Sequence, residues 1–171
     1  MKIYYINSDE FLHKYDLEFL NQYSDKEIKS HKKYIQHCIG RFLIKSAGEK
    51  DYNISNTEIE LKNQKPKFKY SDIKFSLTHC DKYIVSAFDK NECGLDIEKI
   101  KPRNIIELSR YFKKDFQSLK DFYYYWTEYE ASLKLQQKVQ WKYSTIFQND
   151  YILTAVSVNP NLSTPEFINL L

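Results

Sequence analysis

The segment GLDIEKI, residues 94–100, carries two carboxylates spaced two positions apart, Asp96 and Glu98. Side chains of a β-strand alternate between its two faces, so the two acids share one face. Leu95 and Ile97 then take the opposite face. Adjacent anions repel each other and raise one pKa unless a cation or several hydrogen-bond donors lie between them. The spacing therefore predicts that the pair has a partner, either a cation or a set of hydrogen-bond donors.

Three environments are compatible with this acid pair. A divalent metal that prefers oxygen ligands, Mg2+ above all, could lie between the carboxylates. Lys99 or Arg103 could instead form a salt bridge with one of them. The third possibility is solvation by water on an edge strand. The spacing alone does not choose among the three.

A second acidic group lies in FYYYWTEYEASLKLQ, residues 122–136. If this segment is a helix, Glu130 and Lys134 lie four positions apart on one face, where an ordinary pair contributes about 0.2 to 0.5 kcal/mol. Alternatively, Glu130 is a third oxygen ligand opposite Asp96 and Glu98. Lys134 would then meet a phosphate, because Mg2+ shares its coordination shell between carboxylates and substrate phosphates.

Bulk composition limits the setting of these residues. A chain of 171 residues suits one domain or two small, closely packed lobes. The net charge of +3 suggests an anionic ligand or an acidic partner without requiring nucleic acid. The cysteines have no zinc-binding spacing, and free thiols indicate a reducing cytoplasm: they are Cys38, Cys80 and Cys93. Without a signal peptide or a membrane-spanning run, we expect a cytoplasmic monomer that binds neither membrane nor nucleic acid.

Hydrophobic patterning predicts strands mixed with helices. The expected strands are 2–6, 58–61, 74–79, 83–88, 93–100, 142–147 and 151–158. Helices are expected at 104–112 and 119–136. A further helix should begin at a capping box formed by Ser24 and Glu27 and end at Gly48. Its polar face carries a basic stripe made of Lys26, Lys29, Lys33, His37 and Arg41.

Two hexapeptides indicate an internal repeat. YIVSAF at 83–88 and YILTAV at 151–156 match in residue class, and both follow a turn. Each falls late in its half of the chain, as expected for two similar units joined near residue 90. We therefore predict an α+β fold of two similar packed lobes with pseudo-twofold symmetry, each a small sheet with a long helix. The expected lobes are 1–90 and 91–171.

Four motifs together resemble one known family. GLDIEKI followed by WTEYEASLK (126–134) resembles the paired signature of 4'-phosphopantetheinyl transferases, G-[IV]-D-x-E and W-[ST]-x-K-E-[AS]-x-x-K. Upstream, KPKF (65–68) resembles the family's Gly-Lys-Pro turn, and FSLTH (75–79) resembles its F-[NS]-[IL]-S-H strand. The matches stand in the family's order and span residues 65–134. The length is similar to that of compact members of the Sfp-like group.

This resemblance implies a Mg2+-dependent enzyme that moves the 4'-phosphopantetheine arm of coenzyme A to a serine of an apo acyl or peptidyl carrier protein. It implies that Asp96, Glu98 and Glu130 hold the metal on the pyrophosphate, and that Glu130 or a nearby water accepts the serine proton. Lys134 would contact the attacked phosphate as a second catalytic residue. The implied coenzyme A-binding residues are Lys65, Pro66, Thr78, His79 and Lys134.

The resemblance also gives each lobe a role. Lobe 1–90 would bind the 3'-phosphate and adenine of coenzyme A through His79 and Lys65, and lobe 91–171 would bind the metal and pyrophosphate. An acidic helix of the carrier protein is expected to dock near helix 25–47 or close to the lobe interface, because the basic stripe favours an acidic partner.

Three positions depart from the family's pattern. Tyr129 replaces the lysine before the family's glutamate, Gln64 replaces the glycine before Lys65, and Thr78 replaces a serine. A non-catalytic relative that binds coenzyme A or a carrier protein is therefore an alternative. A Mg2+ nuclease is a further alternative, although its ExK motif needs a spacer that Glu98 lacks.

Overall fold

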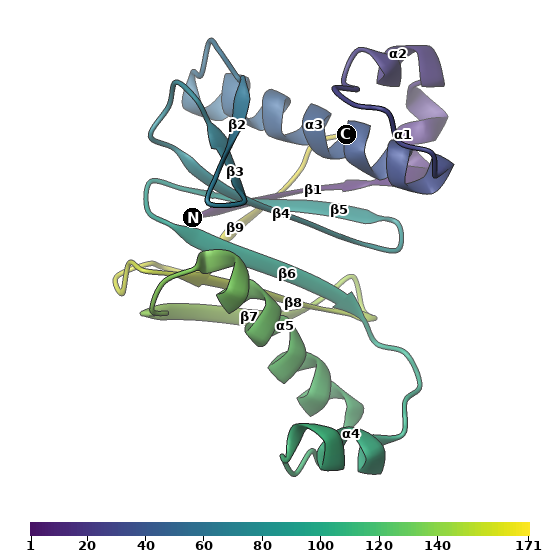
Figure 1. The fold of residues 1–171 in the computed structure, drawn as a ribbon, viewed down its shortest axis with the longest axis vertical. Helices are drawn as coiled ribbons and strands as arrows, with labels where there is room; N and C mark the ends of the chain where they lie inside the picture. Colours follow the sequence, from purple (N-terminus) through teal and green to yellow (C-terminus); the bar gives the residue numbers. More distant parts are fainter.

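The computed structural model describes residues 1–171 as an α+β fold of two lobes (Figure 1). The first lobe contains β1 (Lys2–Asn7), α1 (Ser8–Lys14), α2 (Leu17–Asn21), α3 (His31–Tyr52), β2 (Ile59–Lys62), β3 (Lys65–Phe68), β4 (Lys74–Cys80) and β5 (Tyr83–Asp89). The remaining elements are β6 (Cys93–Lys99), α4 (Ile105–Phe112), α5 (Leu119–Leu135), β7 (Trp141–Phe147), β8 (Tyr151–Ser157) and β9 (Glu166–Asn169).

The two lobes repeat one topology. Each begins with a strand, continues through a long helix and ends with a hairpin whose second strand lies beside the first strand. The resulting strand orders are β1-β5-β4 and β6-β8-β7. The two matching hexapeptides lie in the central strands β5 and β8, in which every residue is buried. The prediction of an α+β fold with two lobes, each a small sheet with a long helix, is confirmed.

Two elements interrupt this repetition. The β2-β3 hairpin is found only in the first lobe. Strand β9 follows the second lobe in the sequence, but it crosses to the first sheet and pairs in parallel with β1, with Glu166 opposite Lys2. In the first sheet β1 therefore lies between β5 and β9. The division into 1–90 and 91–171 stays a prediction about domains.

The elements form four layers, with α3 and α5 on the outside and the two sheets between them. Side chains of α3 pack with Tyr4 and Ile6 of β1 in one hydrophobic core. Leu95 and Ile97 of β6 lie in a second core between the sheets, together with Ile3 of β1. The opposite face of β6 is therefore the one that faces α5. No helix is both long and apolar enough to cross a membrane.

Helix α3 differs from its predicted bounds at both ends. It begins at His31, and its N-cap is Ser30 instead of Ser24. The capping-box prediction was wrong because Asp25 bonds to His37 and Arg41 on α3, which holds residues 24–30 beside the helix. The same contacts partly neutralise the basic stripe.

The helix also continues beyond Gly48 to Tyr52 and ends with Asn53 in the left-handed conformation. Gly48 is a packing residue instead of a helix end, since a Cβ there would lie 3.2 Å from the Phe68 ring.

The KPKF segment, expected as a turn, is strand β3. The turn lies one step earlier, at Asn63 and Gln64, which both have positive φ angles, 51° and 64°. Two such residues between paired strands form the tight hairpin that suits the strand twist. Gln64 thus occupies a backbone conformation that favours glycine.

Candidate active site at the seam between the lobes

The edges of the two sheets meet where β4 lies beside β6, and side chains of β4 replace the missing strand-to-strand hydrogen bonds. The Leu95 backbone N–H donates to Ser76 Oγ at 3.0 Å, and the Lys99 backbone N–H donates to Cys80 Sγ at 3.3 Å. Sequence reasoning missed both β4 residues. Small polar residues at every second position from Ser76 to Cys80 in KFSLTHC are the signal that could have found them.

Asp96 lies in the middle of this seam and is only 6% exposed. Its Oδ1 accepts hydrogen bonds from Thr78 Oγ1 at 3.1 Å and from Lys134 Nζ at 2.7 Å. Its Oδ2 is buried without any hydrogen-bond partner. A buried carboxylate oxygen without a donor is costly, so this atom suits a bound cation.

Lys134 provides a cation beside the acid pair, through its contact with Asp96 Oδ1. Besides Asp96, its Nζ donates to the Leu95 carbonyl at 3.0 Å and to Thr78 Oγ1 at 3.2 Å. An ammonium group has three N–H donors, so all of them are used within the protein. Lys134 therefore ties α5, β6 and β4 together, and it could contact a substrate phosphate only by releasing one of these acceptors.

The two salt-bridge candidates next to the acids play no such part. Lys99 pairs with Asp81 at 3.0 Å, at the far end of β4. Arg103 forms no ion pair. The cation comes from a helix that lies 38 residues away in the sequence.

Glu98 is half-buried at the end of β6. Burial is the main cause that raises its pKa, and the neighbouring Asp96 charge adds to the effect. Cys80 Sγ donates to Glu98 Oε2 at 3.6 Å. Burial raises the pKa of Cys80 to about 11, so the thiol keeps its proton and remains a donor.

Gly94 explains how Lys134 reaches the acids. A Cβ at Gly94 would lie 2.0 Å from the carbonyl oxygen of Ala131 on α5. Only glycine lets the backbone of α5 approach β6 so closely, and Ala131 on the helix side is also small and fully buried. Gly94 of GLDIEKI and Ala131 of WTEYEASLK are thus in direct contact. This contact brings the last turns of α5 onto the strand that carries Asp96 and Glu98.

Thr127 fixes the other half of α5. Its Oγ1 lies 2.8 Å from Thr154 Oγ1 and donates to the Tyr123 carbonyl at 2.9 Å. Both threonines are fully buried, and Thr154 lies directly opposite Asp96 in the β6-β8 pair. Because buried polar groups need partners, this contact favours one rotation of α5 about its axis.

Glu130 is half-buried on α5, four residues before Lys134. The structure contains no group of three His, Cys, Asp or Glu side chains arranged to hold a metal. It therefore brings Asp96 and Glu98 together and leaves Glu130 outside the pair. Two adjacent carboxylates, one with an unpartnered oxygen, fit a hard cation such as Mg2+ as a partial ligand set.

A cavity of about 360 Å3 opens beside the seam. It is bordered by three predicted site residues, namely Lys65, Pro66 and Lys134. Lys65 is tightly held, because its Nζ donates to Glu92 at 2.6 Å and to the Cys93 carbonyl at 3.0 Å. A coenzyme A phosphate would therefore compete with Glu92 for this lysine.

His79 lies away from Lys65. It is exposed near the end of β4, whereas Lys65 lines a cavity with Lys74 at the start of the same strand. Five residues of strand separate the two ends by about 16 Å. The pKa of His79 is lowered, first by partial desolvation of the ring and second by the charge of Lys134. His79 also follows Thr78, whose hydroxyl bonds to Asp96, so the histidine lies close to the acid pair.

Tyr129, which replaces the family lysine, is 45% exposed on α5. Its ring lies 6.4 Å from that of Tyr125 and 5.8 Å from that of Trp126. It extends an aromatic cluster that joins α5 to α4, and it contributes no charge to the seam.

Comparison with curated proteins identifies the class of enzyme that this chain resembles, the 4'-phosphopantetheinyl transferases. The transferase Sfp of Bacillus subtilis (strain 168) is 27% identical over 159 residues, which cover 81% of this chain and 71% of the relative. The transferase ffp of Bacillus subtilis is 26% identical over the same shares of both chains. A third Bacillus subtilis 4'-phosphopantetheinyl transferase is 31% identical over 110 residues, covering 56% of this chain and 49% of the relative.

No family model matches the sequence. The similarities to the three transferases nevertheless confirm the resemblance to the Sfp-like group that the motifs indicate, and they support a transferase enzyme of this type.

Proposed function

We propose that this chain transfers the 4'-phosphopantetheine arm of coenzyme A to a serine of an apo carrier protein in a Mg2+-dependent reaction. The observation that carries the proposal is the seam, where Asp96 has an unpartnered buried oxygen, lies beside Glu98 and is held by Lys134. The names of the relatives support the transferred group. The carrier protein and the metal follow from the motif resemblance.

In the proposed reaction, the serine oxygen bonds to the phosphorus of the phosphopantetheine phosphate. The pyrophosphate bond breaks, and adenosine 3',5'-bisphosphate leaves. Mg2+, when bound, would neutralise the pyrophosphate charge that otherwise opposes attack. Asp96 and Glu98 would hold this ion. The resemblance adds Glu130 as the third ligand, which would have to move toward the pair because it lies outside it in the structure. Glu130 or a water beside it would take the serine proton.

Lys134 would stabilise charge on the attacked phosphate after releasing one of its present acceptors. Because Lys65 and Pro66 border the same cavity as Lys134, we propose that coenzyme A lies along this cavity with its adenosine end toward the β2-β3 hairpin. His79 would bind the 3'-phosphate and adenine end together with Lys65, and Thr78 would contribute to coenzyme A binding from β4. These roles follow the resemblance position by position.

An acidic helix of the carrier protein would dock near α3 or the lobe interface. The basic stripe supports this proposal, although Asp25 already engages His37 and Arg41. Attraction between exposed charges weakens as salt is added. Carrier affinity should therefore fall as ionic strength rises, and affinity independent of salt would contradict electrostatic docking.

Mass spectrometry of carrier proteins tests the function directly. The protein is incubated with coenzyme A, Mg2+ and apo carrier proteins, and a carrier should gain the mass of one phosphopantetheine arm. Asp96→Ala should abolish the gain and keep the folded circular dichroism spectrum. Asp72→Ala, in an exposed loop, is the matched control. Unchanged turnover in Asp96→Ala would contradict the assignment of Asp96 as a metal ligand. If no carrier protein gained mass, the proposed reaction would be wrong.

A non-catalytic relative is the second candidate, favoured by the uncharged Tyr129 and by the three occupied donors of Lys134. Thermal unfolding separates the two candidates. Stabilisation that needs coenzyme A and Mg2+ together favours the transferase. Stabilisation by coenzyme A that Mg2+ does not change, without modification of any carrier, favours the binder.

A further inference from the structure

Strand β4 faces the two acids with a regular series of small polar side chains. These side chains occupy every second position, and each bonds across the seam to β6: Ser76, Thr78 and Cys80. Thr78 bonds to Asp96 and Cys80 bonds to Glu98, both with a sequence separation of 18. Side chains on one face of a strand repeat every two residues. Each acid of β6 therefore has its own partner on β4.

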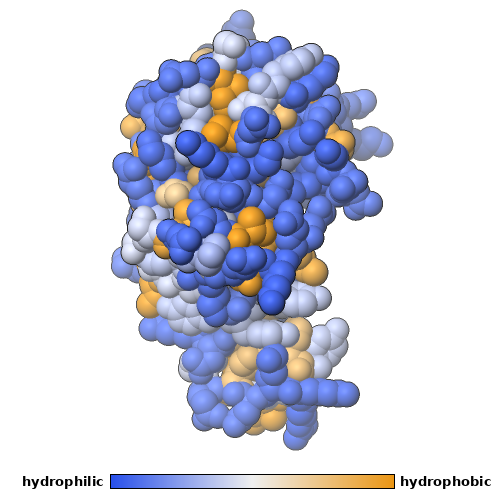
Figure 2. Space-filling model, turned by 90° about the vertical axis from the view of Figure 1, so that its left-hand side faces the viewer, coloured by the Kyte–Doolittle hydropathy of each residue, from blue (hydrophilic) through white to orange (hydrophobic).

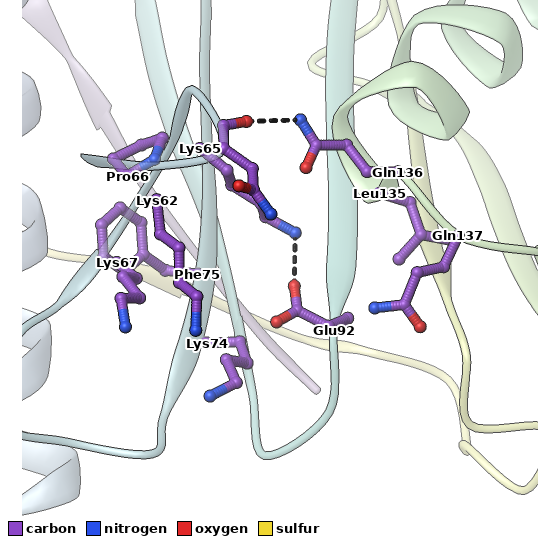
Figure 3. A pocket seen from close by; sticks show the side chains of 11 residues that line it. Lys62, Lys65, Pro66, Lys67, Lys74, Phe75, Glu92, Leu135, Gln136 and Gln137 are labelled. Atoms are coloured by element: carbon purple, nitrogen blue, oxygen red, sulfur yellow. Dashed lines mark hydrogen bonds and ion pairs between the residues drawn. The ribbon is translucent and has the colours of Figure 1, made fainter. Parts of the chain in front are cut away.

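The opposite end of the seam is held without touching either acid. It lies where β6 begins, on the largely hydrophilic side of the molecule that Figure 2 faces. There Lys65 Nζ donates to Glu92 at 2.6 Å, and Gln136 donates to the Asn63 carbonyl at 3.1 Å (Figure 3). These links join the β2-β3 hairpin to the second lobe. They leave the orientation of the two acids to β4 and to Lys134.

The donors on β4 bond to one oxygen of each carboxylate. Asp96 Oδ1 accepts from Thr78, and its buried Oδ2 has no partner. Glu98 Oε2 accepts from Cys80, and no protein group donates to its Oε1. Because a hydrogen bond is directional, it restricts how the carboxylate group turns about its last bond. Each acid thus keeps one oxygen free for a cation, and the donor on β4 determines which oxygen that is.

The sulfur of Cys80 links Glu98 to the backbone of its own strand. It accepts from the Lys99 backbone N–H at 3.3 Å, while the thiol donates to Glu98 Oε2 at 3.6 Å. Asp96 is held by Lys134 as well as by Thr78. Glu98 has no ion pair and no hydrogen-bond donor other than Cys80. Its orientation therefore depends on this one side chain.

We propose that Cys80 is a positioning residue that sets the orientation of the Glu98 carboxylate and thereby its contact with the metal; this inference rests on the proposed function. Cys80 lies just outside FSLTH, so the motif resemblance gives it no role. Removing a group that hydrogen-bonds to a metal ligand typically weakens metal binding by about 10- to 100-fold. A serine hydroxyl can replace the thiol as donor and acceptor, whereas valine has a similar size and provides neither.

Binding of Mn2+ tests this role, since Mn2+ takes the same oxygen ligands as Mg2+ and is detected by electron paramagnetic resonance. The measurement needs neither coenzyme A nor carrier protein. Cys80→Val removes the donor, and Cys80→Ser keeps it. Ser76→Ala is the matched control, because it removes a bond to a β6 backbone N–H without touching either acid. Circular dichroism and urea unfolding verify that every variant folds.

Crystal structures of the unmodified protein and of both Cys80 variants, solved without metal, provide a second measurement. They locate the Glu98 carboxylate directly, so they do not depend on whether the protein binds a metal.

We expect Cys80→Val to bind Mn2+ about tenfold more weakly than the unmodified protein, and Cys80→Ser and Ser76→Ala to bind it within about twofold. The Glu98 carboxylate should turn in Cys80→Val and keep its place in Cys80→Ser. An unmoved carboxylate in Cys80→Val, or an equal and measurable Mn2+ affinity in all four proteins, would overturn the proposal. If no protein bound Mn2+ but the carboxylate still turned in Cys80→Val, the metal of the proposed function would be wrong, and the hold of Cys80 on Glu98 would stand.

Discussion

Tyr4 in the first lobe and Asp96 in the second occupy equivalent positions and have opposite chemistry. The matching hexapeptides align β5 with β8, and their partners follow: Tyr4 lies opposite Ser86, and Asp96 lies opposite Thr154. Tyr4 is fully buried in the core beneath α3. Asp96, in the same register beneath α5, is the centre of the candidate active site. The repeated fold therefore provides a position, and the residue type decides whether it becomes core or site.

The comparison extends to the ends of the long helices. Tyr4 donates its hydroxyl to Asp51 at 2.6 Å, and Asp96 accepts from Lys134 at 2.7 Å. Asp51 and Lys134 each stand one residue before the end of their helix. The same link between first strand and helix is thus a phenol–carboxylate bond in one lobe and an ion pair in the other.

The next residue on the same face repeats the contrast. Ile6 lies opposite Ile84, and Glu98 lies opposite Ile152. The free edges of the two strands also differ, because β9 covers the outer edge of β1 whereas the edge of β6 faces β4. A covered edge suits a closed core. An edge completed only by side chains leaves room for polar groups and a neighbouring cavity.

The two lobes should differ most in how much stability they lose when Gly94, or its equivalent Lys2 in the first lobe, is changed to alanine. Gly94→Ala should lower the free energy of unfolding by about 3 kcal/mol or more, because the added Cβ meets a backbone oxygen that cannot turn aside. Lys2→Ala should cost about 0.5 kcal/mol or less. Urea unfolding measures both. Similar small losses would mean that α5 does not need its close approach to β6.

The helix-end links give the next comparison. Lys134→Met should destabilise by about 2 kcal/mol, since it leaves Asp96 buried without its cation, while partial exposure of the lysine limits the loss. Tyr4→Phe should cost about 1 kcal/mol, the scale of one hydrogen bond. In the Asp96→Asn background, the cost of Lys134→Met should shrink. An undiminished cost there would show that Lys134 stabilises the fold through something other than Asp96.

Tyr129 tests whether the second lobe lacks one charge for catalysis. Tyr129→Lys should raise kcat/KM for transfer by about tenfold, because a charge-assisted contact to phosphate contributes about 1.5 to 3 kcal/mol. Losing the stacking with Tyr125 and Trp126 should cost stability but not rate. Tyr125→Lys, one turn earlier, is the matched control. A rate that stays level or falls in Tyr129→Lys would mean that the charge is already supplied from elsewhere.

The sequence predicted features that depend on local periodicity. Strand alternation placed Asp96 and Glu98 on one face, and the hexapeptide match identified the two central strands before their pairing was known. The helix motif also placed Glu130 and Lys134 correctly on one long helix. These features need only the geometry of a single element.

Other features depend on contacts between distant segments, which no local pattern encodes. Ser24 and Glu27 have the residue types and spacing of a capping box, but no helix begins there. Instead, Asp25 bonds to His37 and Arg41 of α3. The pairing of Asp96 with Lys134 and Thr78 needs two lobes and three elements. Strand β9 is only four residues long, and its place beside β1 follows from pairing across the whole chain.

The smallest expected effect concerns the hairpin that only the first lobe has. Gln64 has a φ of 64°, a left-handed conformation that costs an ordinary residue about 1 kcal/mol or more. Gln64→Gly should therefore raise the free energy of unfolding by about 1 kcal/mol, less the extra freedom that glycine gives the unfolded chain. The turn between β7 and β8 provides the control, because Asn149 has a φ of 68° but asparagine tolerates this region. Asn149→Gly should thus change stability little. If urea unfolding showed equal gains at both turns, the strain assigned to Gln64 would be wrong, and the departure from the family's glycine would have no energetic cost of its own.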